Sequence, residues 1–160
     1  MASARRTDAA SRLINASPQT IYRAFVDPDA WVKWLPPAGM TGRMLDFDFR
    51  EGGSYRMALT YVRLDPGMRG KTSGDTDVAE GRFLEVVENE RMIHLVTFES
   101  DDPAFAGEMK MTWALSPVAG GTNASIICEN VPPGIGQKDH EAALKSTLDN
   151  LAAFVDRASP

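Results

Sequence analysis

The spacing of apolar residues changes along this chain and divides it into helices and strands. The stretch over residues 137–156 has helical spacing, because Leu144, Leu148, Leu151 and Val155 recur four, three and four residues apart. At 1.5 Å per residue, such a helix is roughly 30 Å long. An amphipathic helix of this length has to bury its apolar side, so the rest of the chain must supply a surface for it.

Between Arg43 and Glu129 the apolar residues instead alternate with polar ones, which is the spacing of half-buried strands. The alternation predicts six strands, over residues 43–50, 54–61, 78–87, 92–99, 109–115 and 122–129. Short turns with paired glycines, at Gly52-Gly53 and Gly120-Gly121, favour antiparallel hairpins. A long polar loop is expected over residues 64–76. The six strands therefore predict an antiparallel meander.

The N-terminal part predicts one more strand, over residues 9–16, and two short helices. Ser17-Pro18 is typical of a helix start, and Asp27-Pro28 ends that helix. A second helix over residues 29–34 follows. The order β-α-α-β6-α predicts an α+β domain in which a curved antiparallel sheet wraps around the long C-terminal helix. We expect one domain over residues 1–160, with an ordered core over about 8–157.

Charge and cysteine content narrow the classes of function. A net charge of −5 and a pI near 5.0 argue against binding to nucleic acid or to anionic membranes. The start MASARRTDAASR lacks the apolar segment of a signal peptide, and the only cysteine, Cys128, excludes an intrachain disulfide. We expect a cytoplasmic protein without nucleic-acid or membrane partners. An exposed edge strand leaves a homodimer open.

Several pieces of the chain, in order, resemble one family. They are SPQTIYRAFVDPDAWVKWLPP, DFREGGSYRM, EGRFLEVVENERMIHLVTF, MTWALSPVAGGTNASI and DHEAALKSTLDNLAAFV. They look like the branch of the START-like, or SRPBCC, superfamily that is named after the activator of heat-shock protein 90 ATPase. The resemblance implies the helix-grip fold, with a ligand-sized cavity between the last helix and the sheet. It implies less about function, because one fold hosts many functions.

The residues that could carry chemistry are few. The branch often has Gly-Trp at the start of the last helix, where this chain has Asp139-His140. His140 could act as a general acid or base or bind a ligand, or it could be a partly exposed first-turn residue. His94 could equally be a half-buried residue with its hydrogen bonds satisfied. Cys128 lies in an apolar strand pattern typical of an inert thiol. We expect no catalytic residue, no metal and no cofactor.

The pattern places a large set of aromatic, Met and Leu side chains on faces that point inward. As a set they predict a mostly apolar cavity with a few polar tips, namely Tyr hydroxyls, Trp N–H groups and a histidine. The candidates are Trp31, Trp34, Phe49, Tyr55, Met57, Tyr61, Met109, Met111, Trp113, His140, Leu144 and Leu148.

Three functions fit this pattern. The first is a carrier or sensor that binds a hydrophobic or aromatic small molecule without catalysis. The second is an enzyme of the polyketide cyclase or aromatase type, which a titratable group deep in the cavity would favour. The third is a protein-interaction module with a chaperone as partner, which a filled cavity and an exposed apolar sheet face would favour.

Overall fold

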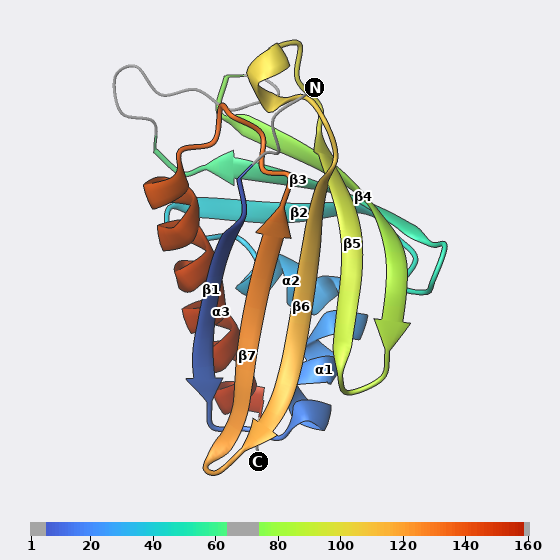
Figure 1. The fold of residues 1–160 in the computed structure, drawn as a ribbon, viewed down its shortest axis with the longest axis vertical. Coiled ribbons are helices and arrows are strands. Elements are labelled where there is room, and N and C mark those ends of the chain that lie inside the picture. Colours follow the sequence, from blue (N-terminus) through green and yellow to red (C-terminus); the bar gives the residue numbers. More distant parts are fainter. Residues whose placement is uncertain (1–5, 64–73, 159–160) are drawn as a thin grey trace.

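The computed structural model describes residues 6–63 and 74–158, which form one curved sheet and three α-helices (Figure 1). The strands are β1 (Asp8–Ile14), β2 (Met40–Phe47), β3 (Ser54–Tyr61), β4 (Thr76–Val87), β5 (Arg91–Phe98), β6 (Met109–Val118) and β7 (Gly121–Glu129). The helices are α1 (Pro18–Val26), α2 (Pro28–Trp34) and α3 (Gln137–Ala158), with a 3-10 turn η1 over Pro103–Phe105. The predicted order of elements and the α+β helix-grip fold are confirmed.

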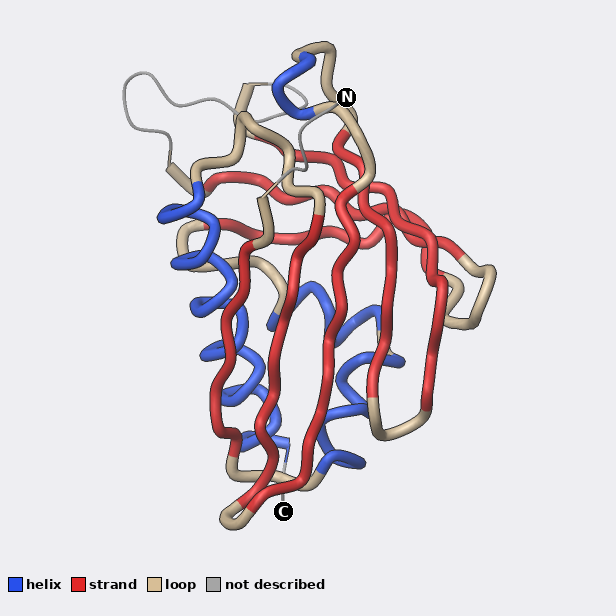
Figure 2. Tube along the Cα trace, viewed as in Figure 1, coloured by secondary structure: helices blue, strands red, loops and turns tan. Residues whose placement is uncertain are grey.

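The sheet is antiparallel throughout, in the order β1-β7-β6-β5-β4-β3-β2. The meander from β2 to β7 follows the chain, and β1 returns to pair with β7 at the edge. Figure 2 shows that β2 and β3 cross the direction of β1, β7 and β6, so the sheet curls strongly. The helices lie on its concave side. This curl creates the space in which the site lies.

Two β-bulges contribute to the curl and correct the predicted alternation. Met44 pairs with Met57 and Asp46 pairs with Arg56, so Leu45 is an extra residue in β2. Met44 therefore packs against the core, although the alternation had assigned Leu45 to the inner face and Met44 to the outer one. The second bulge lies in β4, between Phe83 and Glu85. A bulge adds one residue to a strand without requiring a particular residue type, so the alternation of apolar and polar residues did not predict either bulge.

The strand bounds differ slightly from those predicted. β2 starts at Met40 and ends at Phe47, and β4 starts at Thr76, inside the segment expected to be a loop. Residues 64–73 of that expected loop lie outside the described residues.

Local sequence explains how the two short helices begin and how they are joined. The Ser17 hydroxyl accepts a hydrogen bond from Thr20 N at 3.2 Å, and the Asp27 carboxylate accepts one from Asp29 N at 2.9 Å. Each helix has Pro at its first position. The Trp31 indole N–H donates to Phe25 O at 2.7 Å, which fixes α2 against α1.

The long helix α3 is fixed to both sides of the concave layer. Arg12 of β1 forms an ion pair with Asp149 at 2.6 Å. On the other side, Thr147 Oγ1 donates to Leu35 O at 2.8 Å and Asn150 Nδ2 donates to Pro36 O at 2.9 Å. No helix within the described residues is both long and apolar enough to cross a membrane.

The C-terminal half of α3 completes the core. Leu148 and Leu151 are fully buried, in one cluster with Phe25 and Trp34. Replacing Leu148 by Ala should therefore lower the free energy of unfolding by about 2–5 kcal/mol in urea denaturation. The control is Leu13→Ala, which should cost less than about 0.5 kcal/mol because Leu13 is 53% exposed. Equal losses for the two variants would contradict this packing of α3.

Candidate functional site

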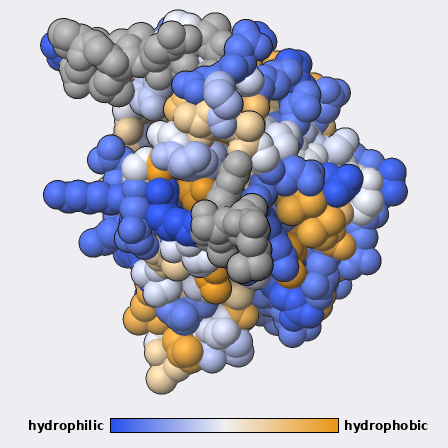
Figure 3. Space-filling view, turned by 45° about the horizontal axis from the view of Figure 1, so that its top comes forward, coloured by the Kyte–Doolittle hydropathy of each residue, from blue (hydrophilic) through white to orange (hydrophobic). Residues whose placement is uncertain are grey.

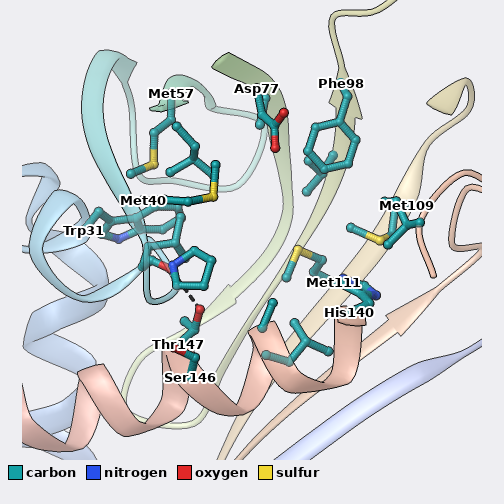
Figure 4. Close-up of a pocket in the computed structure, with 18 of the residues that line it drawn as sticks. Trp31, Met40, Met57, Asp77, Phe98, Met109, Met111, His140, Ser146 and Thr147 are labelled. Atoms are coloured by element: carbon teal, nitrogen blue, oxygen red, sulfur yellow. Dashed lines mark hydrogen bonds between the residues drawn. The ribbon is translucent and has the colours of Figure 1, made fainter. Parts of the chain in front are cut away.

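A cavity of about 490 Å³ lies between the N-terminal half of α3 and the sheet (Figure 4). α3 forms one wall between Asp139 and Thr147, and strands β2 to β6 form the others. Its lining is mostly apolar: Trp31, Leu35, Met40, Met57, Leu59, Val96, Phe98, Met109, Met111, Trp113, Ile135 and Leu144 all contribute. A volume between about 300 and 1,000 Å³ with such a lining is typical of small-molecule sites.

The cavity exists because small residues face each other across this half of the molecule. Ala142 and Ala143 of α3 line it from one side, and Ala79 of β4 lines it from another. One turn further along α3, Leu148 and Leu151 fill the equivalent space. Along α3, the end around Ala143 and Leu144 therefore faces the cavity, and the end with Leu148 and Leu151 is packed.

Four methionines surround the cavity. Figure 4 shows Met40 and Met57 on one side of it and Met109 and Met111 on the other. Methionine side chains are unbranched and polarisable, so they adapt to ligands of different shape. Met40 was not among the residues predicted from the sequence, because the expected strand started at Arg43.

Nine of the twelve predicted residues line the cavity: Trp31, Tyr55, Met57, Tyr61, Met109, Met111, Trp113, His140 and Leu144. Trp34, Phe49 and Leu148 do not, and this corrects the prediction. Trp34 is fully buried, and its indole N–H donates to Ala24 O at 3.0 Å. Phe49 follows the end of β2 and packs against the Phe83 ring. Leu148 belongs to the packed end of α3.

His94 of β5 is the most deeply placed polar residue of the site, with 1% of its surface exposed. Trp113 Nε1 donates to its Nε2 at 2.9 Å, and its Nδ1 lies 3.0 Å from the Tyr55 hydroxyl. Burial lowers the pKa of His94 to about 3, so the ring is neutral at physiological pH. The sequence left His94 as a half-buried residue with its hydrogen bonds satisfied, whereas the structure buries it fully and shows Tyr55 and Trp113 as its partners.

His140 lies at the start of α3 and links the helix to β1. Its Nδ1 is 2.7 Å from Asp8 Oδ2, and Arg6 binds the same carboxylate with two hydrogen bonds of 2.7 and 3.0 Å. Burial alone raises the pKa of Asp8, but hydrogen bonds and positive charge from Arg6 and His140 outweigh it and lower that pKa. The His140 side chain is 11% exposed, so it is a partly exposed residue of the first turn, which was one of the two alternatives, and its contact with Asp8 was not predicted. Asp8 preceded the predicted first strand and was missed.

Asp77 is another acidic residue that the sequence analysis missed. It is 3% exposed, it lines the cavity, and it belongs to β4, although the predicted strand began one residue later, at Val78. Burial, and secondarily the charge of Asp77, raise the pKa of the Tyr61 hydroxyl. Regular alternation with Ala79 and Gly81 was the signal that could have extended this strand back to Asp77.

Nucleophilic and metal chemistry receive little support from this geometry. Cys128 is fully buried, and burial raises its pKa to about 12, so its thiol stays protonated. Over residues 6–63 and 74–158, no group of three or more His, Cys, Asp or Glu side chains is arranged to hold a metal ion. The site is therefore best described as an apolar cavity with a small number of polar groups in its wall.

Comparison with known proteins agrees with this geometry. A family model described as Activator of Hsp90 ATPase homolog 1-like protein matches residues 15–156. The chain belongs to this family. The Activator of Hsp90 ATPase homolog 1-like family lies in the START-like, or SRPBCC, helix-grip superfamily. No curated protein matches the chain.

Solved structures of similar proteins show the same fold. Protein CV1439 from Chromobacterium violaceum is 35% identical, with a TM-score of 0.81, over 94% of this chain and 96% of that one. An AHSA1-like protein from Aeromonas hydrophila is 14% identical, with a TM-score of 0.71, over 96% of this chain and 94% of that one. A Rhodobacter sphaeroides protein is 21% identical, with a TM-score of 0.74, over 96% and 93%. The two more distant structures support the fold alone.

The buried state of His94 predicts how stability depends on pH. The unfolded chain binds a proton at this residue below about pH 6.5, whereas the folded chain does so only near pH 3. The folded state should therefore lose about 2 kcal/mol relative to the unfolded state between about pH 7.5 and pH 5. Urea unfolding at the two pH values should show this loss in the wild type. His94→Gln, which cannot titrate, should lack this part of the loss, and an equal loss in both proteins would contradict the prediction.

Proposed function

We propose that this protein binds a hydrophobic or aromatic small molecule in the cavity beneath α3, as a carrier or sensor. The observation that supports the proposal is the cavity itself, about 490 Å³ in volume and walled largely by Met, aromatic and aliphatic side chains. Burying apolar ligand surface there is favourable by about 25 cal/mol per Å². A flat or aromatic molecule of moderate size fits this volume and lining.

The polar groups in the wall agree with binding rather than with acid–base chemistry. His94, the deepest titratable residue, is neutral and has both ring nitrogens within hydrogen-bonding distance of Tyr55 and Trp113. The indole N–H groups of Trp31 and Trp113 are also bonded within the protein, so they offer their faces rather than their N–H groups to a ligand. Most of the wall can therefore contribute only apolar contact.

One observation favours an enzyme as the second candidate. The Asp8 carboxylate holds Nδ1 of His140 at 2.7 Å beside the cavity, and a carboxylate in this position fixes the orientation of an imidazole for proton transfer. A cyclase-type activity would join two carbons of a linear polyketone and release water. Incubation with heptane-2,4,6-trione tests it: only accelerated formation of the carbocyclic product 3,5-dihydroxytoluene that His140→Gln abolishes would support the enzyme.

The interaction module receives less support from the structure. The cavity is open rather than filled. The large apolar residues that are exposed, such as Leu13, Leu84 and Val118, come from different elements. In the space-filling view of Figure 3, apolar surface forms separate patches between hydrophilic ones. A chaperone partner is therefore not part of our proposal.

Filling the cavity should abolish binding. Ala143→Trp places a large ring in the space that Ala143 leaves open, so affinity for the neutral fluorophore 1-aminoanthracene should fall at least about tenfold. The matched control is Ala153→Trp, on the exposed side of the same helix, which should bind as the wild type does.

Fluorescence titration gives the affinities, and circular dichroism verifies that both variants are folded. If Ala143→Trp binds the fluorophore as tightly as Ala153→Trp does, the ligand does not occupy this cavity and the proposal fails.

A further inference from the structure

Tyr55, His94 and Trp113 form a chain of hydrogen bonds in the wall of the cavity. All three are at most 5% exposed. Trp113 Nε1 lies 2.9 Å from His94 Nε2, and His94 Nδ1 lies 3.0 Å from the Tyr55 hydroxyl. All three residues line the cavity. The direction of each hydrogen bond in this chain decides what the wall can offer to a ligand.

The indole of Trp113 sets that direction. An indole nitrogen only donates, so His94 Nε2 has to accept. A neutral imidazole carries one proton, which must then be on Nδ1. His94 is neutral because it is enclosed by aromatic rings, with the ring centres of Trp31, Tyr55 and Phe83 between 5.4 and 6.1 Å away. His94 Nδ1 consequently donates to the Tyr55 oxygen.

The Tyr55 hydroxyl is thus an acceptor from His94 and keeps its own proton to donate. Burial raises the pKa of Tyr55 well above its usual range, so that proton stays in place. Within residues 6–63 and 74–158, the hydroxyl has no hydrogen-bond partner other than His94. A buried donor without an acceptor is costly, by about 1–3 kcal/mol. The cavity that Tyr55 lines is where an acceptor can reach it.

The backbone of β4 fixes the position of this hydroxyl. Tyr55 of β3 pairs with Gly81, and the Tyr55 ring lies directly over that glycine. A Cβ at Gly81 would overlap the ring, so any other residue there would displace it. The Tyr55 donor is therefore preorganised by the sheet and not free to swing toward other partners.

The rest of the wall indicates that the acceptor is neutral. None of the described residues that line the cavity is Lys or Arg. At the Tyr55 hydroxyl, a ligand carboxylate would therefore lose its water beside the neutral His94 ring, with no Lys or Arg of the described lining residues to pair with it. A carbonyl oxygen does not meet this penalty.

We infer that the ligand is an apolar or aromatic molecule with a neutral oxygen acceptor, such as a ketone, aldehyde or ester carbonyl, that binds the O–H group of Tyr55. The inference rests on the proposed function and adds the polar group by which the ligand is recognised and oriented. The Trp113–His94 pair positions Tyr55 and does not itself touch the acceptor.

Two probes that differ in one oxygen test the inference. 2-Acetylnaphthalene has a ketone oxygen at the position where 2-isopropylnaphthalene has a methyl group, and the two molecules are otherwise similar in size. Removing one neutral hydrogen bond should make Tyr55→Phe bind the ketone about threefold to about tenfold more weakly than the wild type does, as measured by isothermal titration calorimetry. The hydrocarbon should bind the wild type and Tyr55→Phe equally well. Tyr22→Phe, which changes a buried tyrosine of α1 that does not line the cavity, should bind the ketone as the wild type does.

The binding results distinguish a failure of the inference from a failure of the proposed function. If Tyr55→Phe binds the ketone as tightly as the wild type does, or weakens both probes equally, the cavity binds ligands but the inference is overturned. If neither probe binds the wild type, the proposed function fails first and the inference with it. Tighter binding of 2-naphthoate than of the ketone would overturn the choice of a neutral acceptor.

A measurement on the ligand-free protein tests the same chain without any variant. Nitrogen-15 NMR of the imidazole ring distinguishes a protonated from an unprotonated nitrogen. We expect His94 to carry its proton on Nδ1. A proton on Nε2 would make Tyr55 the donor to His94, and the inference would be overturned.

Discussion

The packing of α3 against the concave side of the sheet is the constraint on which the rest of the structure depends. Its C-terminal half buries Leu148 and Leu151 in the core with Phe25 and Trp34, and this fixes the helix in place. Its N-terminal half, with Ala143 and Leu144, lies along the cavity between the helix and the curled sheet. The same helix therefore packs in the core at its C-terminal end and forms a wall of the cavity at its N-terminal end. Because the packed end is held by tight core contacts, the open end does not collapse.

Polar groups around the cavity are mostly satisfied within the protein, which is why so few remain for a ligand. The Trp31 indole holds α2 to α1, the Trp113 indole holds His94, and Asp8 holds His140. Each of these bonds removes the cost of burying a polar group and also fixes a side chain of the wall. Deep in the cavity, the oriented Tyr55 hydroxyl then stands in a largely apolar wall, and such a site selects ligands by shape and by a small number of polar contacts.

Most of the fold followed from periodicity, because one face of each strand and of α3 has to be buried. That reasoning fails where the backbone departs from regular strand geometry and where a strand begins earlier than its apolar residues indicate. The bulge at Leu45 placed Met44 against the core, and β4 extends back to Thr76, the last residue of the segment expected to be a loop. Nine of the candidate residues line the cavity because their side chains point toward the concave side of the sheet, where the cavity lies. Whether an inward residue lines a cavity, as Trp31 does, or fills the core, as Trp34 does, depends on curvature that the sequence does not display.

The most direct test of ligand binding beneath α3 uses the methionines as reporters. NMR of the protein labelled with carbon-13 at its methionine methyl groups follows each residue while 1-aminoanthracene is added. Met40, Met57, Met109 and Met111 line the cavity, whereas the fully buried Met92 lies in the core and does not. We expect large shifts for the four cavity methionines and little change for Met92. Shifts absent from these four, or no larger than that of Met92, would contradict the central claim.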